Sequence, residues 1–194
     1  MTPKREARIN AVLDHRQPTL QVVIENVDDP HNIGAILRSC DAFGIIDVHF
    51  LYTNKKQPRL GELRSKAAAS TLKWLRINRW DSVAKLKAHL KKQKISLLVT
   101  SLGAKSKDPA KLDLTKPVAF AFGNEHSGSS KELMKAADAI VRLPMVGFVE
   151  SFNVSVAAAI SLHEAYRQRS AAGLYDKPQL SKLGRARLLK HWLG

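Results

Sequence analysis

The apolar run at residues 118–122 (VAFAF) constrains the fold of this chain more than any other segment. A strand with apolar side chains on both faces is typical of the centre of a parallel sheet. Similar runs occur at residues 20–25, 46–51 and 95–100. A strand, a helix and a second strand follow one another within residues 20–51, and this order predicts parallel strands joined by a right-handed crossover. The sequence therefore predicts an α/β fold with a parallel sheet.

The clearest helix is predicted over residues 30–43. Asp29 followed by Pro30 is a good helix start, because proline in the first turn sacrifices no hydrogen bond. The apolar positions recur at i, i+3, i+4 and i+7 and form one stripe, made of Ile33, Ile36, Leu37 and Cys40. Gly44 follows as a C-terminal stop.

Other elements are predicted from shorter patterns. Residues 4–16 favour a short basic helix with few apolar positions, which can dock only lightly. Residues 71–77 favour a further strand, and Asp81 is expected to cap a helix through about residue 92. A strand is expected to end near Arg142, and a long alanine-rich helix follows Asn153.

The charge of the chain points to a polyanionic partner. Among 194 residues, 32 Lys and Arg stand against 17 acidic residues, which gives a net charge of +15 and a chain long enough for one domain with a substantial core. Residues 55–94 alone carry 13 Lys or Arg against two acidic residues, and residues 163–194 carry seven against two. A solvated surface needs less than this, so nucleic acid is the first candidate, with a membrane surface as a weak competitor.

The single cysteine, Cys40, excludes an internal disulfide and fits a reducing compartment. Residues 1–8 are charged and lead into no apolar signal core, and no apolar run is long enough to span a membrane. We therefore expect a cytoplasmic protein without a membrane partner. His31, His126 and His163 are too scattered to suggest a metal site, so no metal is expected.

Three loops with small or polar residues follow predicted strands, at residues 100–103, 123–128 and 143–153. In an open α/β sheet, ligands bind beyond the carboxyl ends of the strands, so three converging loops would make a site. The glycine-rich fingerprints of dinucleotide and ATP sites are missing. For residues 142–157 taken alone, an ordinary strand-to-helix connection with Ser151 and Asn153 as capping residues is as good an interpretation as a pocket wall.

Three motifs together resemble a known family. They are residues 29–41 (DPHNIGAILRSCD), residues 122–128 (FGNEHSG), and residues 143–145 (LPM) continued by residues 151–157 (SFNVSVA). Their order over about 130 residues resembles the SPOUT superfamily of S-adenosylmethionine-dependent RNA methyltransferases, in the branch that methylates ribose 2′-hydroxyls. The resemblance implies a parallel α/β sheet with helices on both faces, a C-terminal deep trefoil knot and a homodimer.

Within that branch the chain resembles the TrmH-type enzymes, which modify guanosine 18 in the D loop of tRNA. The resemblance implies a basic N-terminal helical extension (1–18), a methyltransferase domain (19–172) and a basic C-terminal helical extension (173–194). Phe152 stands where leucine is commoner, and His126 and Ser127 replace other residues in the second motif. Neither change removes a needed functional group. The alternatives are a 2′-O-methyltransferase of ribosomal RNA or of another tRNA position, and a non-enzymatic RNA-binding module.

The resemblance also implies the site residues. S-adenosylmethionine would be held by Thr100, Leu102, Gly103, Gly123, Asn124, Glu125, Leu143, Met145, Ser151, Phe152 and Asn153. The catalytic candidates are Arg38, Asn32, Ser151 and Asn153. The candidates for tRNA contacts are Arg8, Arg16, His31, Arg167, Arg169, Arg185 and Arg187.

Arg38 matches the family's catalytic arginine. A guanidinium stays protonated in proteins, so we expect Arg38 to bind a phosphate and stabilise negative charge on the ribose oxygen, with phosphate or water taking the proton. Taken as an isolated residue, Arg38 would be an exposed arginine loosely paired with Asp41. Asn32, Ser151, Asn153 and Glu125 have the alternative of a purely structural capping role.

Overall fold

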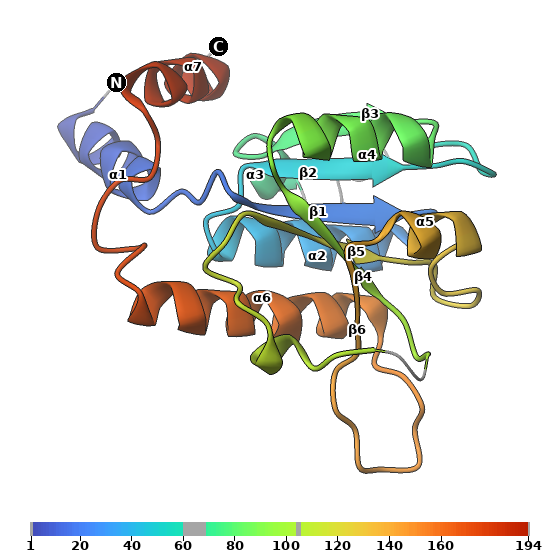
Figure 1. The fold of residues 1–194 in the computed structure, drawn as a ribbon. Coiled ribbons are helices and arrows are strands. Elements are labelled where there is room, and N and C mark those ends of the chain that lie inside the picture. Colours follow the sequence, from blue (N-terminus) through green and yellow to red (C-terminus); the bar gives the residue numbers. More distant parts are fainter. Residues whose placement is uncertain (1, 60–68, 104–105, 194) are drawn as a thin grey trace.

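The computed structural model describes residues 2–59, 69–103 and 106–193, whose core is one parallel sheet (Figure 1). Its strands are β1 (Leu20–Glu25), β2 (Asp47–Leu51), β3 (Arg76–Trp80), β4 (Ser96–Thr100), β5 (Val118–Phe122) and β6 (Ala139–Val141). They are ordered β3-β2-β1-β5-β4-β6, and every neighbouring pair is parallel. The predicted parallel α/β sheet is confirmed, and the run at 118–122 is an interior strand between β1 and β4.

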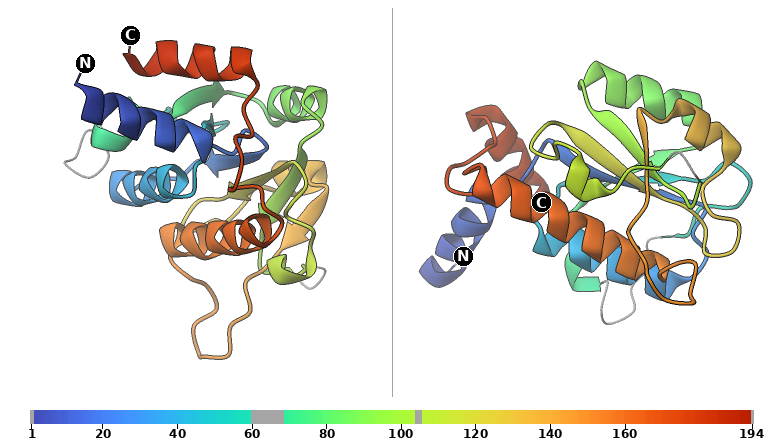
Figure 2. Two further views of the ribbon diagram at one scale, coloured as in Figure 1. Left: turned by 90° about the vertical axis from the view of Figure 1, so that its left-hand side faces the viewer. Right: turned by 60° about the horizontal axis from the view of Figure 1, so that its bottom comes forward.

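Helices cover both faces of this sheet (Figures 1 and 2). They are α1 (Pro3–Asp14), α2 (Pro30–Ala42), α3 (Ala69–Leu72), α4 (Val83–Lys92), α5 (Lys131–Ala136), α6 (Val154–Ala171) and α7 (Lys182–Leu193), with a 3-10 turn at Pro109–Lys111. Helices α2 and α6 share one buried cluster with the sheet, and α4 and α5 share another on the opposite face. In the described ranges, no helix is long and apolar enough to cross a membrane.

Helix α2 forms as its sequence predicts. The Asp29 side chain accepts a hydrogen bond from the backbone N–H of His31 at 2.9 Å, and Pro30 occupies the first turn. Gly44 ends the segment with a φ of 78°, and a Cβ there would lie 2.5 Å from the carbonyl oxygen of His15. The stripe of Ile33, Ile36, Leu37 and Cys40 is fully buried against the sheet. Burial of its three large side chains, those of isoleucine and leucine, stabilises the fold by about 1.5–3 kcal/mol each.

The strand predicted over residues 71–77 is wrong in its bounds. The helical turn α3 covers its first residues, and β3 begins only at Arg76, where the chain pairs in register with Asp47. The Arg76 guanidinium also bonds the Asp47 carboxylate at 2.6 Å, so a tertiary contact sets the start of this strand. Asp81 does not cap α4, because Ser82 takes that position and Asp81 pairs with Lys85 at 2.9 Å.

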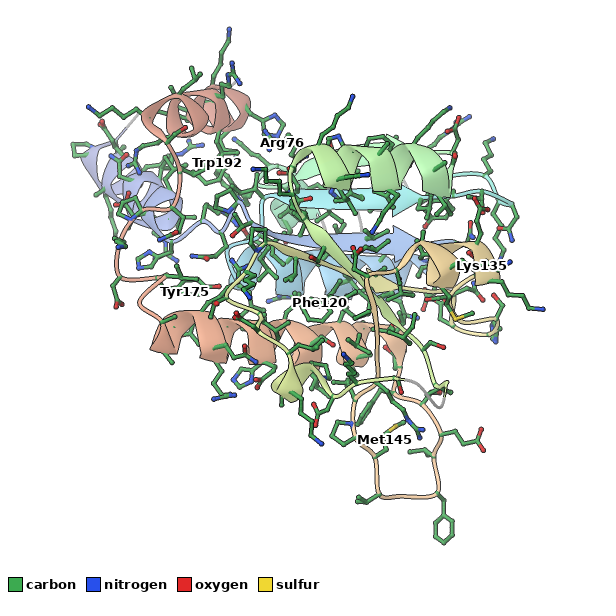
Figure 3. The ribbon with its side chains drawn as sticks, in the orientation of Figure 1. Arg76, Phe120, Lys135, Met145, Tyr175 and Trp192 are labelled. Carbon is green, nitrogen blue, oxygen red and sulfur yellow. The ribbon has the colours of Figure 1, made fainter. Side chains whose placement is uncertain are left out.

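The two terminal helices α1 and α7 lie side by side and form what we call the terminal module (Figure 2). Their shared cluster contains Leu13 and Trp192 together with Ile46, the residue that precedes β2. Trp192 points from α7 toward the sheet (Figure 3), and its indole N–H donates to the carbonyl oxygen of Trp74, just before β3. The terminal module is therefore packed against the amino ends of β2 and β3.

Candidate active site

A cavity of about 520 Å³ lies at the carboxyl ends of β4, β5 and β6. Its walls come from the segments that follow these strands and from the start of α6, so the three loops predicted to converge do converge. Met145 lies on the long loop between β6 and α6 (Figure 3). The volume is in the range of about 300–1,000 Å³ that small-molecule sites occupy.

Ten of the eleven residues predicted to hold the methyl donor line this cavity: Thr100, Leu102, Gly123, Asn124, Glu125, Leu143, Met145, Ser151, Phe152 and Asn153. Gly103 is exposed and is not part of the wall. Sequence reasoning missed other lining residues, among them Ser101, His126, Ser129, Arg142 and Met134. Three of these adjoin predicted positions, and Ser129 directly follows the predicted loop 123–128, which is the signal that could have found these four. Met134 lies on α5, and no pattern in the sequence points to it.

The loop after β5 is folded by its own residues. A Cβ on Gly123 would lie 2.3 Å from the backbone nitrogen of Ser129, so only glycine permits this close approach. The buried side chain of Asn124 donates to the carbonyl oxygen of Asn26 at 2.8 Å and accepts from the backbone N–H of His126 at 3.0 Å. Asn124 therefore shapes the wall of the cavity through its side-chain hydrogen bonds.

A buried carboxylate fixes the far end of the same loop. Glu25, at the end of β1, accepts hydrogen bonds from the backbone N–H of Ser130 at 2.9 Å and from its hydroxyl at 2.5 Å. The hydroxyl of Ser129 donates to the carbonyl oxygen of Thr100 at 3.1 Å. Burial raises the pKa of Glu25. These contacts tie β1, β4 and the loop after β5 together at the cavity.

A chain of side-chain hydrogen bonds joins all three sequence motifs. Asn32 donates from Nδ2 to Glu125 Oε1 at 3.0 Å, and its Oδ1 accepts from Asn153 Nδ2 at 3.0 Å. Asn153 Oδ1 also accepts from the backbone N–H of Ser155 at 2.8 Å and so caps α6. Capping and site formation, which were alternatives in the sequence, are combined in this one side chain.

Arg38 is not brought to the cavity of its own chain. It is exposed on α2 and absent from the cavity wall, since six residues after Asn32 place it about 120° away around the helix. The alternative of a loose pairing with Asp41 is not what the structure has, because Asp41 bonds Arg16 at 2.6 Å instead. Within the described ranges Arg38 forms no hydrogen bond or ion pair.

Two of the predicted tRNA contacts are corrected by the structure. Arg16 and Arg169 are 1% and 0% exposed, so neither side chain can reach a phosphate. Arg16 donates to the carbonyl oxygen of Ile45 at 3.0 Å, and Arg169 donates to that of Leu114 at 2.9 Å. Both guanidinium groups hold the terminal parts of the chain against the sheet.

The other predicted RNA contacts reach the surface. Arg8, His31 and Arg187 are exposed. Arg167 is exposed and pairs with Glu164 at 2.7 Å, and half-buried Arg185 pairs with Asp14. Over the residues with described positions, no group of three His, Cys, Asp or Glu is placed to hold a metal ion.

The fold and the cavity define an α/β protein that binds a small molecule beyond the carboxyl ends of its parallel strands. The model of the SpoU rRNA Methylase family matches residues 19–163 of the chain. The chain therefore belongs to the SpoU methylase family, which the three sequence motifs had indicated.

Known proteins resemble the chain over nearly its whole length. A tRNA (guanosine(18)-2'-O)-methyltransferase of Thermus thermophilus is 40% identical over 99% of this chain and 97% of its own length. The crystal structure of the Aquifex aeolicus TrmH/SpoU tRNA modifying enzyme superposes with a TM-score of 0.86 at 34% identity, covering 97% of this chain and 94% of that one. The SpoU methyltransferase AviRb from Streptomyces viridochromogenes, in complex with the cofactor AdoMet, has a TM-score of 0.70 at 26% identity and covers 81% of this chain and 59% of that one.

Proposed function

We propose that this protein transfers a methyl group from S-adenosylmethionine to the ribose 2′-hydroxyl of guanosine 18 in the D loop of tRNA. The observation that carries the proposal is the near-complete match to a relative named for this reaction, which extends through both terminal helices. Ribosomal RNA or another tRNA position is the alternative substrate.

The walls of the cavity fit this methyl donor. Leu102, Leu143, Met145 and Phe152 supply apolar surface for an adenine ring, and the loops supply backbone groups for its polar edges. When bound there, S-adenosylmethionine supplies a methyl group already activated by its sulfonium. The enzyme then has to hold a ribose oxygen in line with that methyl group and ease the loss of its proton.

The side chains at the cavity can meet these two needs. Ser151 and Asn153 line the wall and can position the donor and the ribose by hydrogen bonds, while Asn32 and Glu125 fix the orientation of the Asn153 amide. Arg38 binds the phosphate beside the target ribose and stabilises negative charge that develops on its oxygen.

A direct experiment separates the candidate substrates. The protein is incubated with labelled methyl donor and with unmodified total tRNA and rRNA, and the 2′-O-methyl groups are mapped. We expect label on tRNA at guanosine 18, and product on rRNA alone would overturn the tRNA assignment. Calorimetry with the donor tests the non-enzymatic alternative, which predicts no binding.

The protein acts as a homodimer. Apolar side chains on the loop after β6 and on α6 lie uncovered in the single chain: Val146, Phe148, Val149, Val156 and Ile160. Phe148 is 108% exposed. A fully exposed aromatic ring is unusual on a surface that binds no partner. The second copy is the occupant we propose for this surface, and it would bring its own Arg38 to the cavity.

A mixed dimer tests this arrangement. Arg38→Ala and Asn153→Ala chains are combined so that each heterodimer contains one of each. If the two residues act across the interface, one of the two sites in each heterodimer is intact, so the isolated heterodimer has about half of the wild-type activity. If both act within one chain, every site lacks one group and the activity stays at the level of the single variants.

The family resemblance also supports three finer proposals. The segment from β6 into α6 is threaded as a deep trefoil knot, residues 1–18 and 173–194 are extensions of a methyltransferase domain, and the protein works in the cytoplasm. Mechanical unfolding tests the knot, because a tightened knot shortens the fully extended chain.

A further inference from the structure

The terminal module and the cavity lie at opposite ends of the strands of the sheet. The module contacts Ile46 and Trp74, which precede β2 and β3, whereas the cavity follows β4, β5 and β6. A strand of five residues spans about 17 Å, so the module stands at least that far from the cavity of its own chain. The arginines of α1 and α7 therefore do not contact RNA immediately beside a nucleotide in that cavity.

Basic side chains also lie at the carboxyl ends of the strands, on the side of the sheet where the cavity is. Lys55 and Lys56 lie on the loop after β2, and Arg79 lies near the end of β3. We call these three side chains the edge surface. Lys56 is exposed and forms no ion pair among the described residues. The Arg79 guanidinium donates to Gln57 Oε1 at 2.9 Å and to the carbonyl oxygen of Pro58 at 3.0 Å. Both acceptors are neutral, so the charge of Arg79 is not compensated.

Hydrogen bonds connect the edge surface to the cavity wall. Lys55 pairs with Asp28, and Asp28 accepts a hydrogen bond from Asn124 Nδ2 at 3.1 Å. Asn124 is the residue that shapes the loop after β5. The backbone N–H of Thr53 donates to Asn26 Oδ1 at 3.2 Å, and this second contact anchors the start of the basic loop beside β1. The edge surface is thus fixed relative to the cavity.

We propose that the edge surface binds the phosphate backbone of the substrate RNA next to the target nucleotide. The proposal rests on the proposed RNA methyltransferase function and adds a contact surface that the sequence motifs do not contain. Lys56 supplies a point charge, and Arg79 presents a guanidinium already held in place by its loop. The RNA runs from the cavity across the ends of β1 and β2 toward β3, because the strand order places these ends in that sequence.

Removal of two charges from the edge surface tests the proposal. Each lost phosphate contact reduces the steepness with which log K falls with log salt by about 0.7–0.9. Two lost contacts therefore correspond to about 15-fold weaker binding of unmodified tRNA transcript at 0.15 M salt, which we expect for the double variant Lys56→Gln/Arg79→Gln. The slope of log K against log salt should accordingly fall by about 1.4 or more. Filter binding across a salt series measures both quantities, and the donor affinity measured by calorimetry should stay unchanged.

A matched control removes two charges at the opposite edge. Lys91 and Lys92 end α4 just before the chain enters β4, and both are exposed without an ion pair among the described residues. Lys91→Gln/Lys92→Gln should retain the wild-type salt slope. Equal losses in the two double variants would overturn the proposal, because they would reflect net charge alone. An unchanged slope in the edge variant would also overturn it.

Single variants and the choice of RNA keep the test decisive. If the edge double variant loses donor binding and is therefore misfolded, the Lys56→Gln single variant replaces it, with an expected fall in slope of about 0.7. If the wild-type enzyme methylates only rRNA, the proposed substrate is wrong, and the slopes are measured on the rRNA that is methylated. The two hypotheses can then fail separately.

Discussion

Arg169 offers the sharpest test of whether a basic side chain supports the fold or binds RNA. Its guanidinium is fully buried and donates five hydrogen bonds, all to neutral acceptors on two segments, residues 17–19 and 114–116: Leu114 O, Gln17 Oε1, Thr19 Oγ1, Thr19 O and Lys116 O. Burial lowers its pKa to about 10, which leaves it protonated at neutral pH. Arg169→Ala leaves these acceptors without donors and opens a cavity, and unsatisfied buried acceptors together with a large-to-small change cost about 3–5 kcal/mol.

Arg167 provides a matched control only two residues away. Its ion pair with Glu164 is exposed to solvent, and exposed ion pairs contribute little to stability. For a chain of this length 1 kcal/mol corresponds to about 2–4 °C, so Arg169→Ala should lower the melting temperature by about 10–15 °C and Arg167→Ala by a few degrees at most. Urea titration of both variants measures the free energy of unfolding, and salt-dependent tRNA binding measures the phosphate contacts. If Arg169→Ala kept the wild-type urea midpoint and lowered the salt slope, the structural role assigned here would be refuted.

Three further predictions follow from single contacts. Burial lowers the pKa of His49 to about 4 from an unfolded value near 6.5, so the free energy of unfolding should fall by up to about 3 kcal/mol as the pH drops from 6.5 to 4. Urea titrations at pH 7 and 4.5 should show a weaker pH dependence for His49→Gln, and equal dependence would contradict this. Arg38→Lys should lose most of the turnover rate with unchanged donor affinity, because lysine lacks the planar two-pronged contact; retained turnover would exclude that contact. Glu25→Gln should weaken donor binding in calorimetry about tenfold, because an amide cannot accept both hydrogen bonds from Ser130. An unchanged dissociation constant would show that the loop does not depend on this carboxylate.

The sheet was predictable because its strands have a local signature. Apolar runs such as residues 118–122 need no tertiary information to be recognised, and α2 has its own start, stripe and stop. The edge strand β3 was misplaced because none of its five residues is fully buried and because Arg76 pairs with Asp47, 29 residues earlier. No local pattern contains such a contact.

The candidate site was predictable in its loops and less so in its charged residues. Arginine side chains are usually exposed, which favours a surface position for Arg16 and Arg169, yet both are buried and donate to backbone carbonyl oxygens. The bond between Asn32 and Glu125 joins residues 93 positions apart, and only the folded chain brings them together. For Arg38 the sequence motif identifies the residue, but it does not predict its position, which is outside the cavity of its own chain.

Asn153 shows how one side chain combines the structural and functional interpretations, and a single substitution can separate them. In Asn153→Asp a carboxylate oxygen can still accept from the backbone N–H of Ser155, so the α6 cap survives and the free energy of unfolding should change by less than about 0.5 kcal/mol. In the same variant a carboxylate oxygen replaces the amide NH2 group that donates to Asn32 Oδ1. Because two oxygens repel each other, the hydrogen-bonded chain that leads through Asn32 to Glu125 is broken. Methyl transfer should therefore fall at least tenfold while the urea midpoint stays near that of the wild type. Asn153→Ala, which removes both contacts, should lose about 1 kcal/mol of stability as well as activity. If the aspartate variant kept full activity, the amide of Asn153 would be only a helix cap, because the cap is the one contact that this variant preserves.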